Sequence, residues 1–80
     1  MPLFYIDLHD GSELVRDTEG FDLPDAEAAL TKMVQVMKRV AELLDTTSDH
    51  QAYQATVRDQ HDRVIAQANL TLDMDVVDAF

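Results

Sequence analysis

The fold is decided by residues 3–25, which read LFYIDLHDGSELVRDTEGFDLPD. Apolar and polar side chains alternate over residues 3–9, which is typical of a β-strand with one buried face. Asp10-Gly11 then predicts a tight turn, because glycine adopts positive φ without steric cost. Residues 13–16 are the expected return strand, and residues 17–20 are an acidic second turn. The stretch therefore predicts a β-hairpin that leads directly into the next element.

That next element is a long amphipathic helix over residues 24–44. Pro24 is preset for a first helical turn, and Asp25 can accept hydrogen bonds from the exposed N–H groups there. Apolar residues recur with helical spacing and form one stripe: Ala26, Ala29, Leu30, Met33, Met37, Val40, Ala41 and Leu44. We expect this stripe to face the core, with Phe21 and Leu23 packing beneath the helix.

A second hairpin is predicted over residues 51–70, after a polar loop. Tyr53, Ala55 and Val57 alternate with polar residues, and residues 59–62 form the turn. Because alanine is a mediocre strand former, a helix over residues 63–70 is the alternative. The chain is thus expected to form a single domain over residues 1–80, with its first hairpin at 1–23, its helix at 24–44, its second hairpin at 51–70 and a tail at 71–80.

The predicted fold class is α+β, with the order β-β-α-β-β. An antiparallel four-stranded sheet should carry the one long helix on one face. Tyr5 places an aromatic ring on the other face, and the tail contains several apolar residues. Either the tail docks as a short helix or an extension, or it frays. A covering layer or a homodimer contact on the second face is therefore predicted.

The charge of the chain restricts its partners. There are 6 basic and 16 acidic residues, which gives a net charge of −10. Such a field repels nucleic acids and anionic membranes, but it can steer a basic protein partner toward the surface. The sequence has no cysteine, no basic signal-peptide region and no apolar run of membrane-spanning length. We therefore predict a cytoplasmic protein.

Several short motifs can be compared with known families: residues 4–11, Asp17 with Glu19-Gly20, Leu23-Pro24-Asp25, and Val57-Arg58-Asp59 running to Val64. Together they resemble a family of short bacterial proteins that form a domain of unknown function. In that pattern a strand ends in His-Asp-Gly, and an Asp-x-x-Gly turn and a Leu-Pro-Asp helix start follow. The resemblance covers residues 2–70 and implies this fold and a bacterial source, but no activity and no cofactor. Here His61-Asp62 occupies a late turn where the family usually has glycine.

A weaker likeness concerns the Leu-Pro-Asp turn between short strands and an Ala-rich helix. It is similar to the N-terminal domains of HicB-type antitoxins. That analogy implies an antitoxin-like regulator that binds a small basic partner.

The candidates for a metal site are Asp7, His9 and Asp10. Asp7 and His9 share one strand face two residues apart, so that their side chains can reach one ion. A small metal-binding or metal-dependent hydrolytic protein is therefore an alternative function. The simpler interpretation makes Asp7 and His9 exposed strand residues and Asp10 a turn residue. We adopt it, and we expect no metal ligands, no cofactor and no catalytic residues.

Other chemistries find little support in the sequence. An EF-hand loop has its glycine at the sixth position, whereas Gly20 is fourth counting from Asp17. Ser12 and Ser48 lie outside any nucleophile elbow, and two glycines are too few for a phosphate-binding loop. We predict that the protein is not an enzyme but a non-catalytic protein-interaction or regulatory module.

Overall fold

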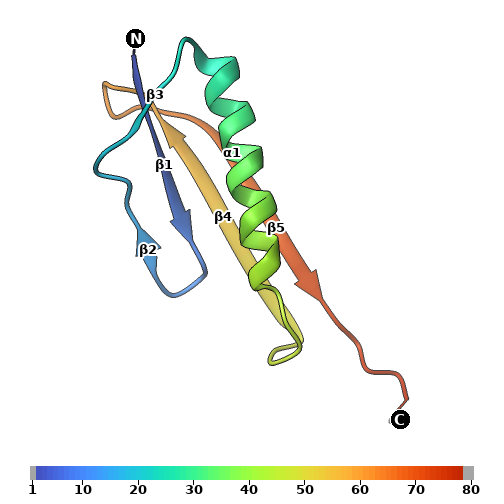
Figure 1. Cartoon of the computed structure of the whole chain (residues 1–80). Coiled ribbons are helices and arrows are strands. Elements are labelled where there is room, and N and C mark those ends of the chain that lie inside the picture. The colour runs from blue at the N-terminus through green and yellow to red at the C-terminus, as the bar shows by residue number, and fades with distance from the viewer. Residues whose placement is uncertain (1, 79–80) are drawn as a thin grey trace.

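The computed structural model describes residues 2–78, which form one antiparallel sheet with one helix across one face (Figure 1). The strands are β1 (Leu3–His9), β2 (Leu14–Val15), β3 (Phe21–Asp22), β4 (His50–Arg58) and β5 (Val64–Asp73). Helix α1 spans Ala26–Val40 and ends in a short 3₁₀ helix, η1 (Ala41–Leu43). The predicted α+β class is confirmed, and the second hairpin consists of strands rather than a helix.

The return strand of the first hairpin is two short pieces. β2 pairs with β1 at Leu8↔Val15, and β3 pairs with β1 at Phe4↔Phe21. Between these pieces, residues 16–20 leave the ladder. The sequence predicted one return strand that ends at a turn, whereas in the structure the turn interrupts the strand and pairing then resumes.

The sheet has the strand order β2-β1-β4-β5, with β3 also beside β1. β5 extends through residues 71–73, which the sequence analysis assigned to the tail. The backbone N–H of Met74 then donates to the carbonyl of Asp49 at 2.7 Å. Beyond this point the chain leads away from the body of the molecule (Figure 1). The described part of the tail is therefore not the second covering layer that the sequence suggested, and residues 79–80 lie outside the described range.

The core lies between α1 and the two central strands. It contains Phe4 and Ile6 from β1, Ala55 and Val57 from β4, and Ala29 and Met33 from α1. Phe21, Leu23 and Met37 pack against this cluster, as the sequence predicted. The helix begins at Ala26 rather than at Pro24, and Asp25 caps it as predicted, because its side chain accepts a hydrogen bond from the N–H of Ala28 at 2.8 Å.

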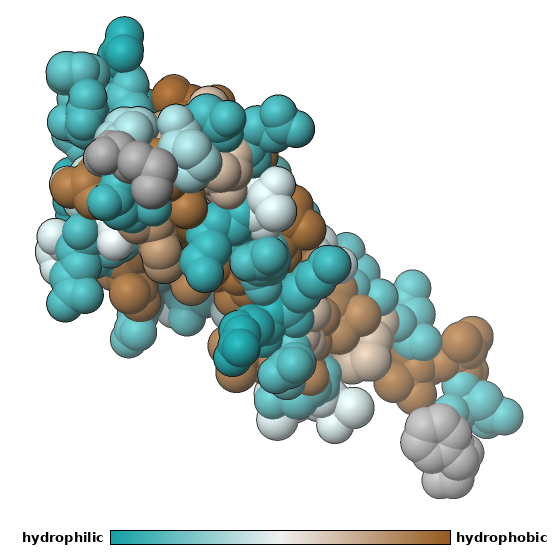
Figure 2. Space-filling model, turned by 45° about the horizontal axis from the view of Figure 1, so that its top comes forward, coloured by the Kyte–Doolittle hydropathy of each residue, from teal (hydrophilic) through white to brown (hydrophobic). Residues whose placement is uncertain are grey.

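The other face of the sheet is mainly polar. Cross-strand neighbours there include Asp7 with Thr56 and His9 with Gln54. The side-chain amide of Gln54 also donates to Asn69 on β5 at 3.1 Å. Viewed as a solid surface, the elongated molecule shows hydrophobic areas interspersed with hydrophilic ones, and this mixture continues to its narrow end (Figure 2). Within residues 2–78, no helix has the length and apolar character to cross a membrane.

Candidate functional site

The polar face holds a buried ion pair that two antiparallel strands bring together. Arg58 lies opposite Tyr5, and Asp7 lies opposite Thr56 on the same strand pair. Arg58 and Asp7 are therefore diagonal neighbours on one face, within reach of a long side chain. Alternation along each strand sends the intervening Ile6 and Val57 into the core on the other side.

The ion pair has bidentate geometry. Arg58 Nε donates to Asp7 Oδ2 at 2.7 Å, and Arg58 Nη2 donates to Asp7 Oδ1 at 3.0 Å. Only 10% of the Arg58 side chain and 8% of the Asp7 side chain are exposed. The guanidinium carbon also lies 4.9 Å from the centroid of the Tyr5 ring. Paired donors and a flat aromatic neighbour suit the planar guanidinium far better than they would suit a lysine.

The network continues into the turn between β4 and β5. Asp62 Oδ1 accepts from Arg58 Nη1 at 2.6 Å and from Arg16 Nη2 at 3.1 Å. Asp62 has a φ of 64°, a left-handed conformation that glycine adopts freely. Here a residue that tolerates this conformation also supplies a carboxylate to the arginine.

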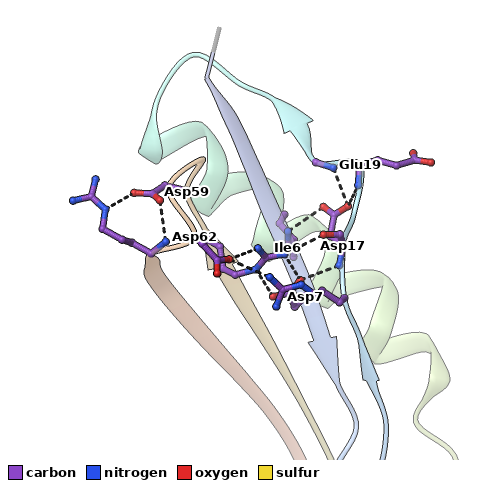
Figure 3. A network of polar contacts seen from close by, with 10 residues as sticks. Ile6, Asp7, Asp17, Glu19, Asp59 and Asp62 are labelled. Atoms are coloured by element: carbon purple, nitrogen blue, oxygen red, sulfur yellow. Dashed lines mark hydrogen bonds and ion pairs between the residues drawn. The ribbon is translucent and has the colours of Figure 1, made fainter.

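Asp17 joins the interrupted edge of the sheet to the same network (Figure 3). Its carboxylate accepts from the backbone N–H of Ile6 at 3.1 Å, and of Glu19 and Gly20 at 3.1 and 2.9 Å. Its own N–H donates to Asp7 Oδ1 at 2.9 Å, and its carbonyl accepts from Arg58 at 3.0 Å. The side chain of Asp17 thus satisfies a β1 backbone group where the neighbouring strand is absent.

The electrostatics keep both central groups charged. The hydrogen bonds from Arg58 lower the pKa of Asp7, and this effect outweighs burial, which raises it. The same hydrogen bonds with Asp7 raise the pKa of Arg58. A general acid or base works best with a pKa near the operating pH, and both shifts lead away from neutrality. The pair is therefore arranged to hold structure rather than to transfer protons.

The three candidate metal ligands have separate roles in the structure. The Nδ1 atom of His9 accepts from the N–H of Gly11 at 3.1 Å. Asp10 Oδ1 accepts from the N–H groups of Ser12 and Glu13 at 3.0 and 2.7 Å, which is the predicted turn role. These backbone bonds lower the pKa of Asp10. The expectation for Asp7 is wrong: it is not an exposed strand residue, because it is buried against Arg58. Among the residues that the structure describes, no three metal-ligating side chains form a cluster.

The central residue that sequence reasoning missed is Arg58. The motif Val57-Arg58-Asp59 was visible in the sequence, but its arginine was given no role. The available signal was an arginine at a strand position, in a chain with 6 basic and 16 acidic residues. Such a residue is expected to find a carboxylate if the strand position buries it. Which carboxylate it contacts depends on the pairing of β1 with β4.

An open cleft of about 350 Å³ lies on the helix side of the interrupted edge. Its lining includes Ile6, Leu8, Val15, Phe21 and Val36, and is mainly apolar. The Asp7–Arg58 pair is not part of this lining. The structure thus separates the buried ion pair from this concavity.

The lowered pKa of Asp7 predicts a specific loss of stability in acid. A carboxyl whose folded-state pKa lies below its unfolded value, about 3.9, stabilises the protein above that value and loses this contribution as the pH falls through the folded pKa. We expect the free energy of unfolding to decrease below about pH 4, and to decrease less steeply in Asp7→Asn. The residual slope in the variant comes from Asp10, Asp45 and Asp59, whose pKa values are also lowered. Urea unfolding between pH 2 and 5 measures both slopes, and equal slopes would contradict the assignment.

Comparison with known proteins identifies a family. A family described as "Domain of unknown function (DUF6894)" matches residues 3–71. Neither the curated proteins nor the solved structures that were compared gave a match to this chain.

Proposed function

We propose that this chain, which belongs to the DUF6894 family, is a non-catalytic protein-interaction module that binds through the free edge of strand β5. The observation that carries the proposal is the state of that edge. Within residues 2–78, β5 pairs with β4 alone. Its ten residues therefore present one row of backbone N–H and C=O groups for addition of a further strand.

The composition of β5 supports this use. Natural sheets protect long edges with lysine, proline or inward-pointing charges. Residues 64–72 contain no charged residue and no proline, although 28% of the chain is charged. This is the longest uncharged run in the sequence. A strand without these protective features is typical of an edge that is covered in the working state of the protein.

The net charge of −10 has a separate effect on partner choice. It favours approach of a basic protein and disfavours nucleic acids, because phosphate binding requires a basic surface. A basic protein partner is accordingly part of the proposal, with contacts on the acidic body of the molecule.

A non-catalytic role is supported by the polar network. Asp7, Arg58 and Asp17 use their charged or polar atoms to bond one another and nearby backbone groups. A catalytic acid or base needs an atom that faces the substrate and a pKa matched to the reaction. In this network the buried carboxylate and the guanidinium hold together β1, β4 and the segment at residues 16–20.

Site-specific photocrosslinking in cells of the source organism tests the proposal. A photoreactive residue in place of Asn69 samples the β5 edge, and the same residue in place of Gln35 samples an exposed helix position as the matched control. We expect a protein adduct at position 69, whether with another copy or with a second protein, and much less at position 35. An absence of any position-69 adduct would contradict the proposed binding edge.

A further inference from the structure

We infer that the β5 edge is occupied by a second copy of this chain, which pairs antiparallel to it about a two-fold axis at Ala68. This inference rests on the proposed function, because it names the occupant of the same edge. It gives one continuous sheet with both helices on the same face.

The backbone of β5 has the correct orientation for such pairing. Met74 donates to Asp49, in register with the His50↔Asp73 pair. Hydrogen-bonded and non-hydrogen-bonded pairs alternate along an antiparallel ladder. Residues 66, 68, 70 and 72 therefore direct their N–H and C=O groups toward β4, and residues 67, 69 and 71 direct theirs outward. A two-fold axis at Ala68 places Gln67 opposite Asn69 of the second copy, so that outward groups meet outward groups.

The distribution of charge favours a second copy as the occupant. Two copies with a net charge of −10 each repel over most of their surfaces. Residues 64–72 carry no charge, so that pairing here brings no like charges opposite each other. Arg63 comes directly before this run and Asp73 directly after it. An antiparallel arrangement brings the Arg63 end of one strand to the Asp73 end of the other, twice by symmetry. Both side chains are largely exposed, at 74% for Arg63 and 72% for Asp73, and within one copy Arg63 pairs with Asp59 and Asp73 with His50.

The helix contributes an apolar flank above the same edge. The flank of α1 nearest β3 is marked by Lys32, whose ammonium lies 5.0 Å from the centroid of the Phe21 ring. Val36 lines the cleft beside Phe21 on that same flank. Because each residue advances about 100° around a helix, Leu30 and Val34 lie on the opposite flank, toward β5. They are 40% and 49% exposed. With a two-fold axis at Ala68, this flank of α1 faces the same flank of the second copy across the two paired β5 strands.

The absence of cysteine in the chain makes the register directly testable. Ala68 of each copy would form a non-hydrogen-bonded pair, with Cα atoms about 4.5 Å apart, within the range that a disulfide spans. We expect Ala68→Cys to form a disulfide dimer rapidly under mild oxidation. Ala66→Cys should not, because residue 66 would lie opposite Leu70 of the second copy. Rapid dimerisation of both variants, or of neither, would overturn the register.

A charge exchange provides a second test with matched variants. Gln67→Lys with Asn69→Lys places lysine opposite lysine at two symmetric positions, whereas Gln67→Glu with Asn69→Lys places glutamate opposite lysine. Both double variants carry lysine at position 69 and therefore lose the Gln54–Asn69 contact equally. Sedimentation equilibrium should show dimers for the wild type and for the lysine–glutamate variant, and at least about tenfold weaker dimerisation for the lysine–lysine variant. Equal dimerisation of the two double variants would overturn the pairing.

Different experimental results would overturn the inference and the proposed function. A wild-type chain that stays monomeric up to about 100 μM overturns the second copy as occupant. If the position-69 crosslinker still captures a different protein in cells, the binding edge stands with another occupant. A monomer that also gives no position-69 adduct overturns both.

Discussion

Replacing Arg58 with methionine is expected to lower the free energy of unfolding by about 3 kcal/mol at pH 7. The substitution preserves much of the side-chain volume but leaves the carboxylate of Asp7 buried without its cation. It also removes the donor to the carbonyl of Asp17. A domain of 80 residues has a small stability margin, so that a loss of this size removes a large part of it. Urea unfolding at a single fixed protein concentration measures the change.

A double-mutant cycle separates the ion pair from general damage to the fold. Asp7→Asn keeps an oxygen that can accept from the N–H of Asp17 but removes the charge. In Asp7→Asn with Arg58→Met no buried charge is left unpaired. We therefore expect the double variant to lose less stability than the two single variants together. Arg39→Met is the matched control, because Arg39 is exposed on α1, away from the β5 edge, and its replacement should affect stability little. Additive losses, or an equal loss in Arg39→Met, would contradict the role of Arg58.

Replacing Asp17 with alanine is expected to destabilise the protein by about 2–3 kcal/mol. Its carboxylate accepts hydrogen bonds from the N–H groups of Ile6, Glu19 and Gly20. The N–H of Ile6 is part-buried and faces the gap between β2 and β3, where no neighbouring strand replaces the lost acceptor. Hydrogen exchange at Ile6 should accelerate strongly in Asp17→Ala, while exchange at Val57 follows only the change in global stability.

Asp17→Asn provides the graded control. Its side-chain oxygen can still accept from Glu19 and Gly20, but its amide group cannot accept from Ile6. We expect an intermediate loss of stability, with exchange at Ile6 faster than in the wild type. If the protection of Ile6 is unchanged in both variants, Asp17 does not replace the missing strand partner.

The elements that sequence analysis predicted correctly depend on short-range signals. Alternation identified β1, and Asp25 with the apolar stripe identified α1, because the relevant residues lie within a few positions of each other. The interruption between β2 and β3 was missed. It depends on Asp17 bonding to Ile6, which is 11 positions away. A run such as residues 17–20 is compatible with a turn that ends a strand and with one that interrupts it.

The site was less predictable than the fold for a related reason. Asp7 and Arg58 are separated by 51 positions and meet only through the register of β1 with β4. A shift of that register by one residue would send either side chain to the opposite face. Asp7 was recognised as a residue of interest, but as one of three possible ligands. Its true partner could be named only once the two strands were aligned.

The pairing of β1 with β4 also affects how the protein is made. During translation, β1, the interrupted edge and α1 are all synthesised before β4. Half of the apolar sheet surface under the helix and the arginine that neutralises Asp7 are then still missing. The emerging N-terminal half therefore cannot bury its hydrophobic residues until residue 58 has been synthesised. The N-terminal half therefore completes its core only with the second hairpin, and the net charge of −10 favours solubility of the chain until then.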